Sequence, residues 1–162
     1  MSVGSEVLPF EGVTTGEVES AYRELGPSLM RLGWLLTSNR TDAEDVLQNV
    51  FTRYGRLESR PERPDAYLRA MIVNAVRDLY RSRSRDERFG QPVDDEPIEA
   101  DPEVIEIWDA VQRLPQDQRE VLVLRYHDDL STEEIAEVLQ CPVGTVRSRL
   151  SRGLARLRKE YR

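Results

Sequence analysis

Arginines near the C-terminal end of the chain have the spacing of a helix that reads DNA. Four apolar residues recur there at steps of four and three and form one stripe of a helix: Val146, Leu150, Leu154 and Leu157. Arginine, serine and threonine occupy the other faces. Arginine can pair bidentately with guanine in the major groove, whereas serine and threonine mostly position phosphates. The residues that we predict to contact DNA here are Thr145, Arg147, Ser148, Arg149 and Arg152.

The segment just before this helix completes a helix-turn-helix. Ser131 and Glu134 have the spacing of a capping box, which starts a short helix, and Gln140-Cys141 forms a tight turn. Pro142 suits the first turn of the next helix, because that turn needs no N–H partner. Taken alone, an amphipathic helix with solvated arginines is the simpler interpretation. The capped helix and the short turn before it favour DNA binding.

The remaining elements are also predicted to be helical, so the predicted fold class is all-α. Apolar periodicity indicates helices over 17–37, 41–56, 64–81, 102–114 and 116–126, and no segment alternates as a strand does. Gly26-Pro27 is expected to kink or divide the first helix. Thr41 with Glu44 has capping-box spacing for the second. Asp101 is the expected cap before Pro102, and His127 is expected to end the last of these helices.

The distribution of proline and charge predicts two helical modules joined by a linker. Residues 89–102 contain three prolines, one glycine and no apolar periodicity, which predicts an extended, flexible acidic linker. The predicted divisions are a leader over 1–16, a first module over 17–88, the linker over 89–101 and a second module over 102–162.

The net charge of −7 conceals two basic patches. The segment from Arg69 to Arg88 contains six arginines and three acids. The segment from Arg147 to Arg162 contains seven basic residues and a single acid, Glu160. Between them, Asp94 to Asp109 holds eight acids and no base. Charges more than about 10 Å apart are screened at moderate salt, so the local field decides contact with phosphates. The net charge therefore does not exclude a DNA partner.

Composition excludes several other classes of function. The chain has no signal peptide or membrane span, one cysteine (Cys141) and one histidine (His127), so neither an intrachain disulfide nor a zinc site is expected. It also has no Gly-rich phosphate loop and no nucleophile–base pair. We expect a cytoplasmic protein that is not an enzyme and that holds no metal or cofactor.

Four ordered blocks of sequence resemble a known family. The blocks Asp42–Phe51, Ala66–Asp78, Leu114-Pro115 and Pro142–Leu150 are similar to the small extracytoplasmic-function sigma factors, a group of the sigma-70 family of bacterial RNA polymerase. The resemblance spans nearly the whole chain. It implies a sigma-two domain, a linker and a sigma-four domain that together bind core polymerase, recognise both promoter elements and open the duplex.

The resemblance also implies roles for particular residues. The second helix would hold the clamp helices of polymerase through Asp45, Gln48, Asn49 and Phe51. The third helix would capture bases turned out of the −10 element with Tyr67, Met71 and Asn74, since stacking and hydrogen bonds can offset the cost of extraction. Its arginines would hold phosphates near the melting point: Arg77, Arg81, Arg83 and Arg85. The second module would read the −35 element and contact the polymerase flap.

Two interpretations remain open for the linker, and two rivals remain for the function. The linker either threads the RNA-exit path of polymerase as a mimic of nucleic acid or keeps the two modules apart. An anti-sigma inhibitor is a further partner that the resemblance implies. The alternative function is a stand-alone dimeric helix-turn-helix regulator, which would leave the residues from Asp42 to Arg85 without a role. The other rival is an adaptor that binds only proteins.

Overall fold

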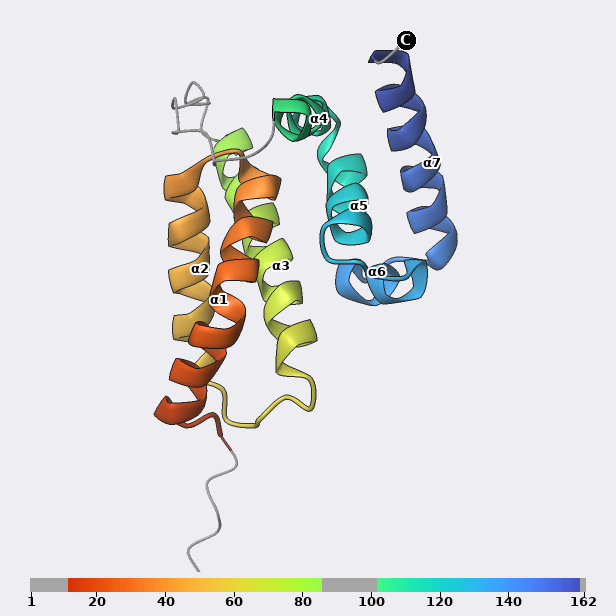
Figure 1. Cartoon of the computed structure of the whole chain (residues 1–162). Coiled ribbons are helices and arrows are strands. Elements are labelled where there is room, and N and C mark those ends of the chain that lie inside the picture. The colour runs from red at the N-terminus through yellow and green to blue at the C-terminus, as the bar shows by residue number, and fades with distance from the viewer. Residues whose placement is uncertain (1–11, 86–101, 161–162) are drawn as a thin grey trace, which may run out of the picture.

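The computed structural model describes residues 12–85 and 102–160, and all regular structure in these two ranges is helical. The helices are α1 (Thr15–Thr37), α2 (Arg40–Tyr54), α3 (Pro64–Arg85), α4 (Pro102–Gln112), α5 (Gln116–Tyr126), α6 (Thr132–Leu139) and α7 (Val143–Glu160). Helices α1 to α3 form one body and α4 to α7 form a second body beside it (Figure 1). The predicted all-α class with two helical modules is therefore confirmed. The predicted linker, Asp101 and most of the predicted leader lie outside the described residues.

The first module is a three-helix bundle around an apolar core. Leu32, Leu36, Val50, Leu68 and Ile72 are each almost fully buried between its helices. Each such side chain contributes about 1.5–3 kcal/mol on burial, which is the main stabilising term of a bundle this small. This core holds α2 and α3 in fixed positions relative to each other, so that each presents a defined outer face.

Local capping residues set the starts of α1 and α2. A capping box between Thr14 and Glu17 starts α1 two residues before the predicted position. The predicted box between Thr41 and Glu44 is wrong. Asn39 caps α2 instead, because its Oδ1 accepts the N–H of Asp42 at 3.0 Å. Glu44 is held by Arg40 one turn earlier, with Nε and Oε1 3.0 Å apart, so Thr41 lies inside the helix.

Pro27 lies within α1, which runs as one helix across it. A proline at this position leaves the carbonyl of Arg23 without its helical partner. Both Pro27 and Arg23 lie on the exposed face of the helix, so that solvent can satisfy the carbonyl. The predicted division of this helix at Gly26-Pro27 is therefore not found.

The second module packs α7 tightly across α5. Gly153 makes this possible, because a Cβ at that position would lie only 2.9 Å from Cδ1 of Leu122. The predicted bounds of α5 are confirmed: it begins directly after Pro115 and its C-cap is His127. Helix α7 begins at Val143, and Pro142 precedes it, accepting the N–H groups of Thr145 and Val146.

The two modules are in direct contact, with α1 and α3 packed against α5 and α6 (Figure 1). The last carbonyls of α1 accept hydrogen bonds from the second module: Leu35 O from Gln112 Nε2 (2.6 Å) and Leu36 O from Arg119 Nη1 (3.1 Å). The hydroxyl of Tyr80 in α3 also donates to Leu36 O (3.0 Å). The second module thus helps to cap the carbonyl end of α1, where helical partners run out.

Candidate nucleic-acid interface

The helix-turn-helix is built by the caps that the sequence indicates. The Ser131 hydroxyl accepts the N–H of Glu134 (3.1 Å), and the Glu134 carboxylate accepts the N–H of Ser131 (2.8 Å), so the predicted capping box is confirmed. These hydrogen bonds lower the pKa of the Glu134 carboxyl below its ordinary value. Gln140 ends α6 in the left-handed conformation, with φ of 50°. Val146 and Leu150 on α7 are buried, which fixes the opposite face of α7 outward.

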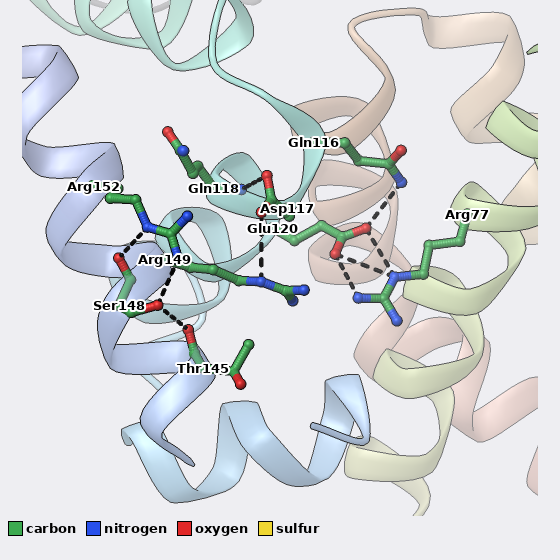
Figure 2. A network of polar contacts seen from close by, with 9 residues as sticks. All are labelled: Arg77, Gln116, Asp117, Gln118, Glu120, Thr145, Ser148, Arg149 and Arg152. Atoms are coloured by element: carbon green, nitrogen blue, oxygen red, sulfur yellow. Dashed lines mark hydrogen bonds and ion pairs between the residues drawn. The ribbon is translucent and has the colours of Figure 1, made fainter. Parts of the chain in front are cut away.

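Arg147 and Arg152 are exposed on α7 and available to a groove. Arg147 lies 3.5 Å from Glu133, an exposed contact of little stabilising value. Arg152 donates to the hydroxyl of Ser148 at 2.8 Å, and Thr145 lies one turn earlier on the same side (Figure 2). Thr145, Ser148 and Arg152 therefore lie along one side of α7, and Arg147 is exposed on another side of the helix.

Arg149 differs from the other predicted residues of α7. Its side chain is 24% exposed and extends toward α5, where its Nε lies 3.5 Å from Asp117 (Figure 2). It lines a cleft of about 530 Å³ between the two modules, together with residues of α3 and α5. In this arrangement Arg149 faces the other module, whereas Arg147 and Arg152 are exposed.

The predicted base-capture face of α3 is partly open to solvent. Asn74 is exposed, Tyr67 is 39% exposed and Met71 is half-buried. Arg81 is also exposed, and it lies 3.4 Å from Asp78 one turn back on the same helix. An amide, an aromatic ring and an arginine on neighbouring turns can supply hydrogen bonds, a stacking surface and a phosphate contact to an extruded base.

Two of the α3 arginines predicted to hold phosphates are held by acids of other helices, which the sequence analysis did not predict. Arg77 donates to Glu120 of α5 through Nε (3.0 Å) and Nη2 (2.7 Å). Arg83 makes two hydrogen bonds to the carboxylate of Asp42 in α2. The side-chain hydrogen bonds that the guanidinium groups donate to these carboxylates raise the pKa of both arginines. Arg85 ends α3, and its side chain lies outside what the structure describes.

The outer face of α2 presents three of the four residues predicted to bind polymerase. Asp45, Gln48 and Asn49 are exposed. Phe51 is buried instead, and its ring packs edge-on against Tyr22, with ring centroids 5.0 Å apart. Phe51 therefore supports the face from beneath and cannot contact a partner directly.

An apolar groove runs between α1 and α2, next to this face. Its lining includes Tyr22, Met30, Leu47 and Gln48. The ring of Tyr22 is 51% exposed, which is a large exposure for an aromatic side chain over a core. The sequence analysis predicted the two helices but did not identify the groove between them. Helical periodicity alone does not show where two neighbouring helices leave a depression.

Within residues 12–85 and 102–160, no three His, Cys, Asp or Glu side chains are grouped as metal ligands would be. No helix among the described residues is long and apolar enough to cross a membrane.

Comparison with known proteins gives consistent matches to one family over both modules. Residues 21–86 match the family described as sigma-70 region 2, and residues 105–157 match the family described as sigma-70, region 4. The RNA polymerase sigma-E factor of Streptomyces coelicolor is 35% identical over 151 residues, which cover 89% of this chain and 85% of that protein. The ECF RNA polymerase sigma factor SigW of Bacillus subtilis is 31% identical over 155 residues, which cover 83% of this chain and 83% of that protein.

A solved structure shares the arrangement of both modules. The sigma factor RpoE of Bartonella quintana, in complex with the anti-sigma factor NepR, superposes with a TM-score of 0.76 at 25% sequence identity. The superposition covers 87% of this chain and 94% of that chain, so it includes both modules.

Proposed function

The chain belongs to the sigma-70 family of RNA polymerase sigma factors, in the extracytoplasmic-function (ECF) group, and we propose that it brings core polymerase to promoters through two DNA contacts. The first module binds polymerase and the −10 element, and the second module binds the −35 element. The chain has no catalytic activity of its own. It acts in the cytoplasm, where polymerase and promoter DNA are.

The observation that carries this proposal is the outward face of α7 in the helix-turn-helix. Val146 and Leu150 are buried, so Arg147 and Arg152 must point away from the module. Each arginine that pairs bidentately with a guanine contributes about 1–3 kcal/mol of discrimination against the wrong base. Thr145 and Ser148 are half-buried on the side of α7 that Arg152 occupies, and they are suited to positioning phosphates.

The polymerase contact is assigned to the outer face of α2. Asp45, Gln48 and Asn49 form its exposed polar part, and the apolar groove beside them adds a surface that a helix can enter. The occupant proposed for the polar face is the clamp-helix pair of polymerase. Anti-sigma factors are a further partner class, because the relative from Bartonella quintana is in complex with one.

The strand-opening contact is assigned to the exposed side of α3. Asn74, Tyr67 and Arg81 are open there, whereas Arg77 and Arg83 are held by acids in this arrangement. Extracting a base costs a few kcal/mol, and stacking can return about 1–3 kcal/mol for each base. Tethering to the −35 contact makes the second contact intramolecular, so each contact alone can be weak.

In vitro transcription tests the proposal directly. Core polymerase is incubated with a genomic library, with and without the chain, and the start sites are mapped. We expect new start sites that share two elements. In the triple variant R147A/R149A/R152A, dependence on the −35 element should be lost while binding to core polymerase is retained. The matched control R158A/K159A removes charge from the far end of α7 and should leave the start sites unchanged.

Two experimental outcomes would contradict the proposed function and favour another one. A palindromic footprint at micromolar concentration without polymerase would favour a stand-alone dimeric regulator. Normal start sites with the triple variant would favour an adaptor that binds only proteins.

A further inference from the structure

The apolar groove between α1 and α2 leaves a large part of an aromatic ring exposed. The groove has a volume of about 850 Å³, within the range of cavities that hold small molecules, and lies between two helices that run side by side (Figure 1). Leu47 in its lining is buried and Met30 is half-buried, whereas Tyr22 is 51% exposed. Apolar surface is more stable out of water, so a segment that covers this ring would be stabilised.

An unpaired backbone acceptor lies at the same groove. Pro27 has no N–H, so the carbonyl of Arg23 lacks its helical partner, and both residues line the groove. Gly26 between them has no side chain, and a Cβ there would be in ordinary contact with the ring of Tyr22, at 3.9 Å. The N–H groups within a helix are already paired, whereas those of an extended segment are free to donate to such a carbonyl. An extended apolar segment therefore fits the groove.

The charges along the groove balance each other. Its lining holds two acids, Glu19 and Glu44, and two arginines, Arg23 and Arg40. Arg40 and Glu44 already lie 3.0 Å apart. The groove therefore favours an occupant with little charge, and its apolar surface supplies most of the contact.

Residues 1–11 precede the described part of the chain and have the composition that the groove favours. Between Val3 and Phe10 the only charged residue is Glu6. Pro9 favours an extended backbone for Leu8, the residue before it. In an extended segment Leu8 and Phe10 share one side, because side chains alternate along it. The apolar residues that can cover the groove are Val3, Val7, Leu8 and Phe10.

The chain enters α1 close to one end of the groove. Val13 is buried, and its N–H donates to the carbonyl of Leu57, just after α2, at 3.3 Å. The groove extends along α1 from Val18 to Met30, which is about 18 Å at 1.5 Å per residue. Eleven extended residues can span roughly 36 Å. Residues 3–10 can therefore reach every part of the groove without any change in the bundle.

We propose that residues 3–10 dock as an extended segment in the groove between α1 and α2, with Leu8 and Phe10 on the ring of Tyr22 and a backbone N–H donating to the carbonyl of Arg23. The segment is tethered to α1, so docking is intramolecular and needs little intrinsic affinity. Gln48 lines the groove and also belongs to the face assigned to polymerase. Core polymerase must therefore displace the docked segment. The docking is independent of the proposed function, and only this competition rests on it.

Paramagnetic broadening in the full chain tests the docking. A nitroxide label is attached at S5C in a C141S background, and the amide signals that it broadens are identified by NMR. We expect strong broadening at Tyr22 and Met30 and none at Arg156 in α7. L8D/F10D should lower the ratio of docked to free segment about tenfold or more, and so remove the broadening. The matched control S2D/G4D adds the same charge, keeps both apolar side chains and should retain the broadening.

A substitution within α1 tests the acceptor. P27A returns an N–H to the carbonyl of Arg23, so the ratio of docked to free segment should fall about two- to tenfold, with helicity by circular dichroism retained. The matched control is S28A, at the next position, which is exposed and does not line the groove. An unchanged ratio in P27A would overturn the proposed hydrogen bond.

Two results would overturn the docking as a whole. One is equal broadening in the parent and L8D/F10D, or none at Tyr22 in the parent. The other is broadening that passes between chains, when spin-labelled chain is mixed with isotope-labelled chain that carries no nitroxide. That result would assign the groove to a second copy of the chain.

Binding to core polymerase tests the competition. If about nine tenths of the parent chains are docked, L8D/F10D should bind polymerase up to about tenfold more tightly, and S2D/G4D should not. Equal affinities, with the broadening present in the parent, would overturn the competition. Failure of every variant to bind polymerase, with the same broadening, would instead overturn only the proposed function.

Discussion

We expect Arg83 of α3 to stabilise the fold and not to bind DNA. Both of its terminal nitrogens donate to the carboxylate of Asp42, whose side chain is 9% exposed, while Arg83 itself is 37% exposed. Exposed ion pairs contribute about 0.2–1 kcal/mol, and breaking a fully buried pair costs about 3–5 kcal/mol. For this half-buried pair we expect D42A and R83A each to lower the free energy of unfolding by about 1–3 kcal/mol. Their coupling in a double-mutant cycle should be about 1–2 kcal/mol.

Arg81 is the matched control for this prediction, because it lies on the same helix and is exposed, with Asp78 3.4 Å away. R81A should change the free energy of unfolding by less than about 0.5 kcal/mol. It should instead reduce the slope of log K against log salt for duplex binding by about 0.9, the loss of one phosphate contact. R83A should leave that slope unchanged.

Unfolding in urea supplies the measurement for the first module. The chain has two tryptophans, Trp34 in α1 and Trp108 in α4, and both pack against the core. In a W108F background the fluorescence of Trp34 therefore follows the unfolding of the module that contains the Asp42–Arg83 pair. A coupling free energy between Asp42 and Arg83 below about 0.3 kcal/mol would refute the reasoning. It would also be refuted if R83A lowered the salt slope of duplex binding as far as R81A does while leaving the free energy of unfolding unchanged.

Three further predictions concern the second module and its packing. S131A should lower the free energy of unfolding, followed by Trp108 fluorescence, by about 1 kcal/mol, whereas S151A at an exposed position of α7 should change it by less than about 0.5 kcal/mol. The pKa of the Glu134 carboxyl is lowered by its hydrogen bonds to Ser131. The stability that this carboxylate contributes is therefore present above pH 4.5 and is lost as the pH falls through its folded-state pKa. An NMR titration midpoint of Glu134 at or above 4.5 would contradict this prediction. G153V should lower the free energy of unfolding by about 1–3 kcal/mol through contact with Leu122, whereas G16V, which meets nothing within 4 Å, should leave it within about 0.5 kcal/mol.

Local signals in the sequence predicted the helices because caps and periodicity act over a few residues. The box of Ser131 with Glu134 and the end of α5 at His127 were correct, since each depends on groups within one turn. The start of α2 was wrong because two capping candidates lie within three positions. Asn39 reaches the N–H of Asp42, and Arg40 takes up Glu44, which leaves Thr41 without a box to form.

The partners of the arginines could not be predicted in the same way. Arg77 and Glu120 are 43 positions apart, and Arg83 and Asp42 are 41 apart, so no short-range spacing connects them. The resemblance to the family implied a phosphate contact for each of these arginines, and both lie in a basic stretch of the sequence. A basic stretch on a helix covers several faces, and the fold decides which of its members meet an acid. The sequence therefore indicated a basic helix correctly but could not divide its arginines between fold and DNA.

One signal for the contact between modules was present in the sequence, in the middle of α5. Val121, Leu122, Val123 and Leu124 are consecutive, and four consecutive residues extend most of the way around a helix. A helix that is apolar all round must be covered all round. All four side chains are buried, and α1 of the first module is among the helices that cover α5. Val123 lies on the same side as Gln116 and Glu120, at steps of three and four, so the carboxylate that binds Arg77 stands beside apolar surface. The contact between the modules therefore combines apolar surface with the ion pair of Arg77 and Glu120.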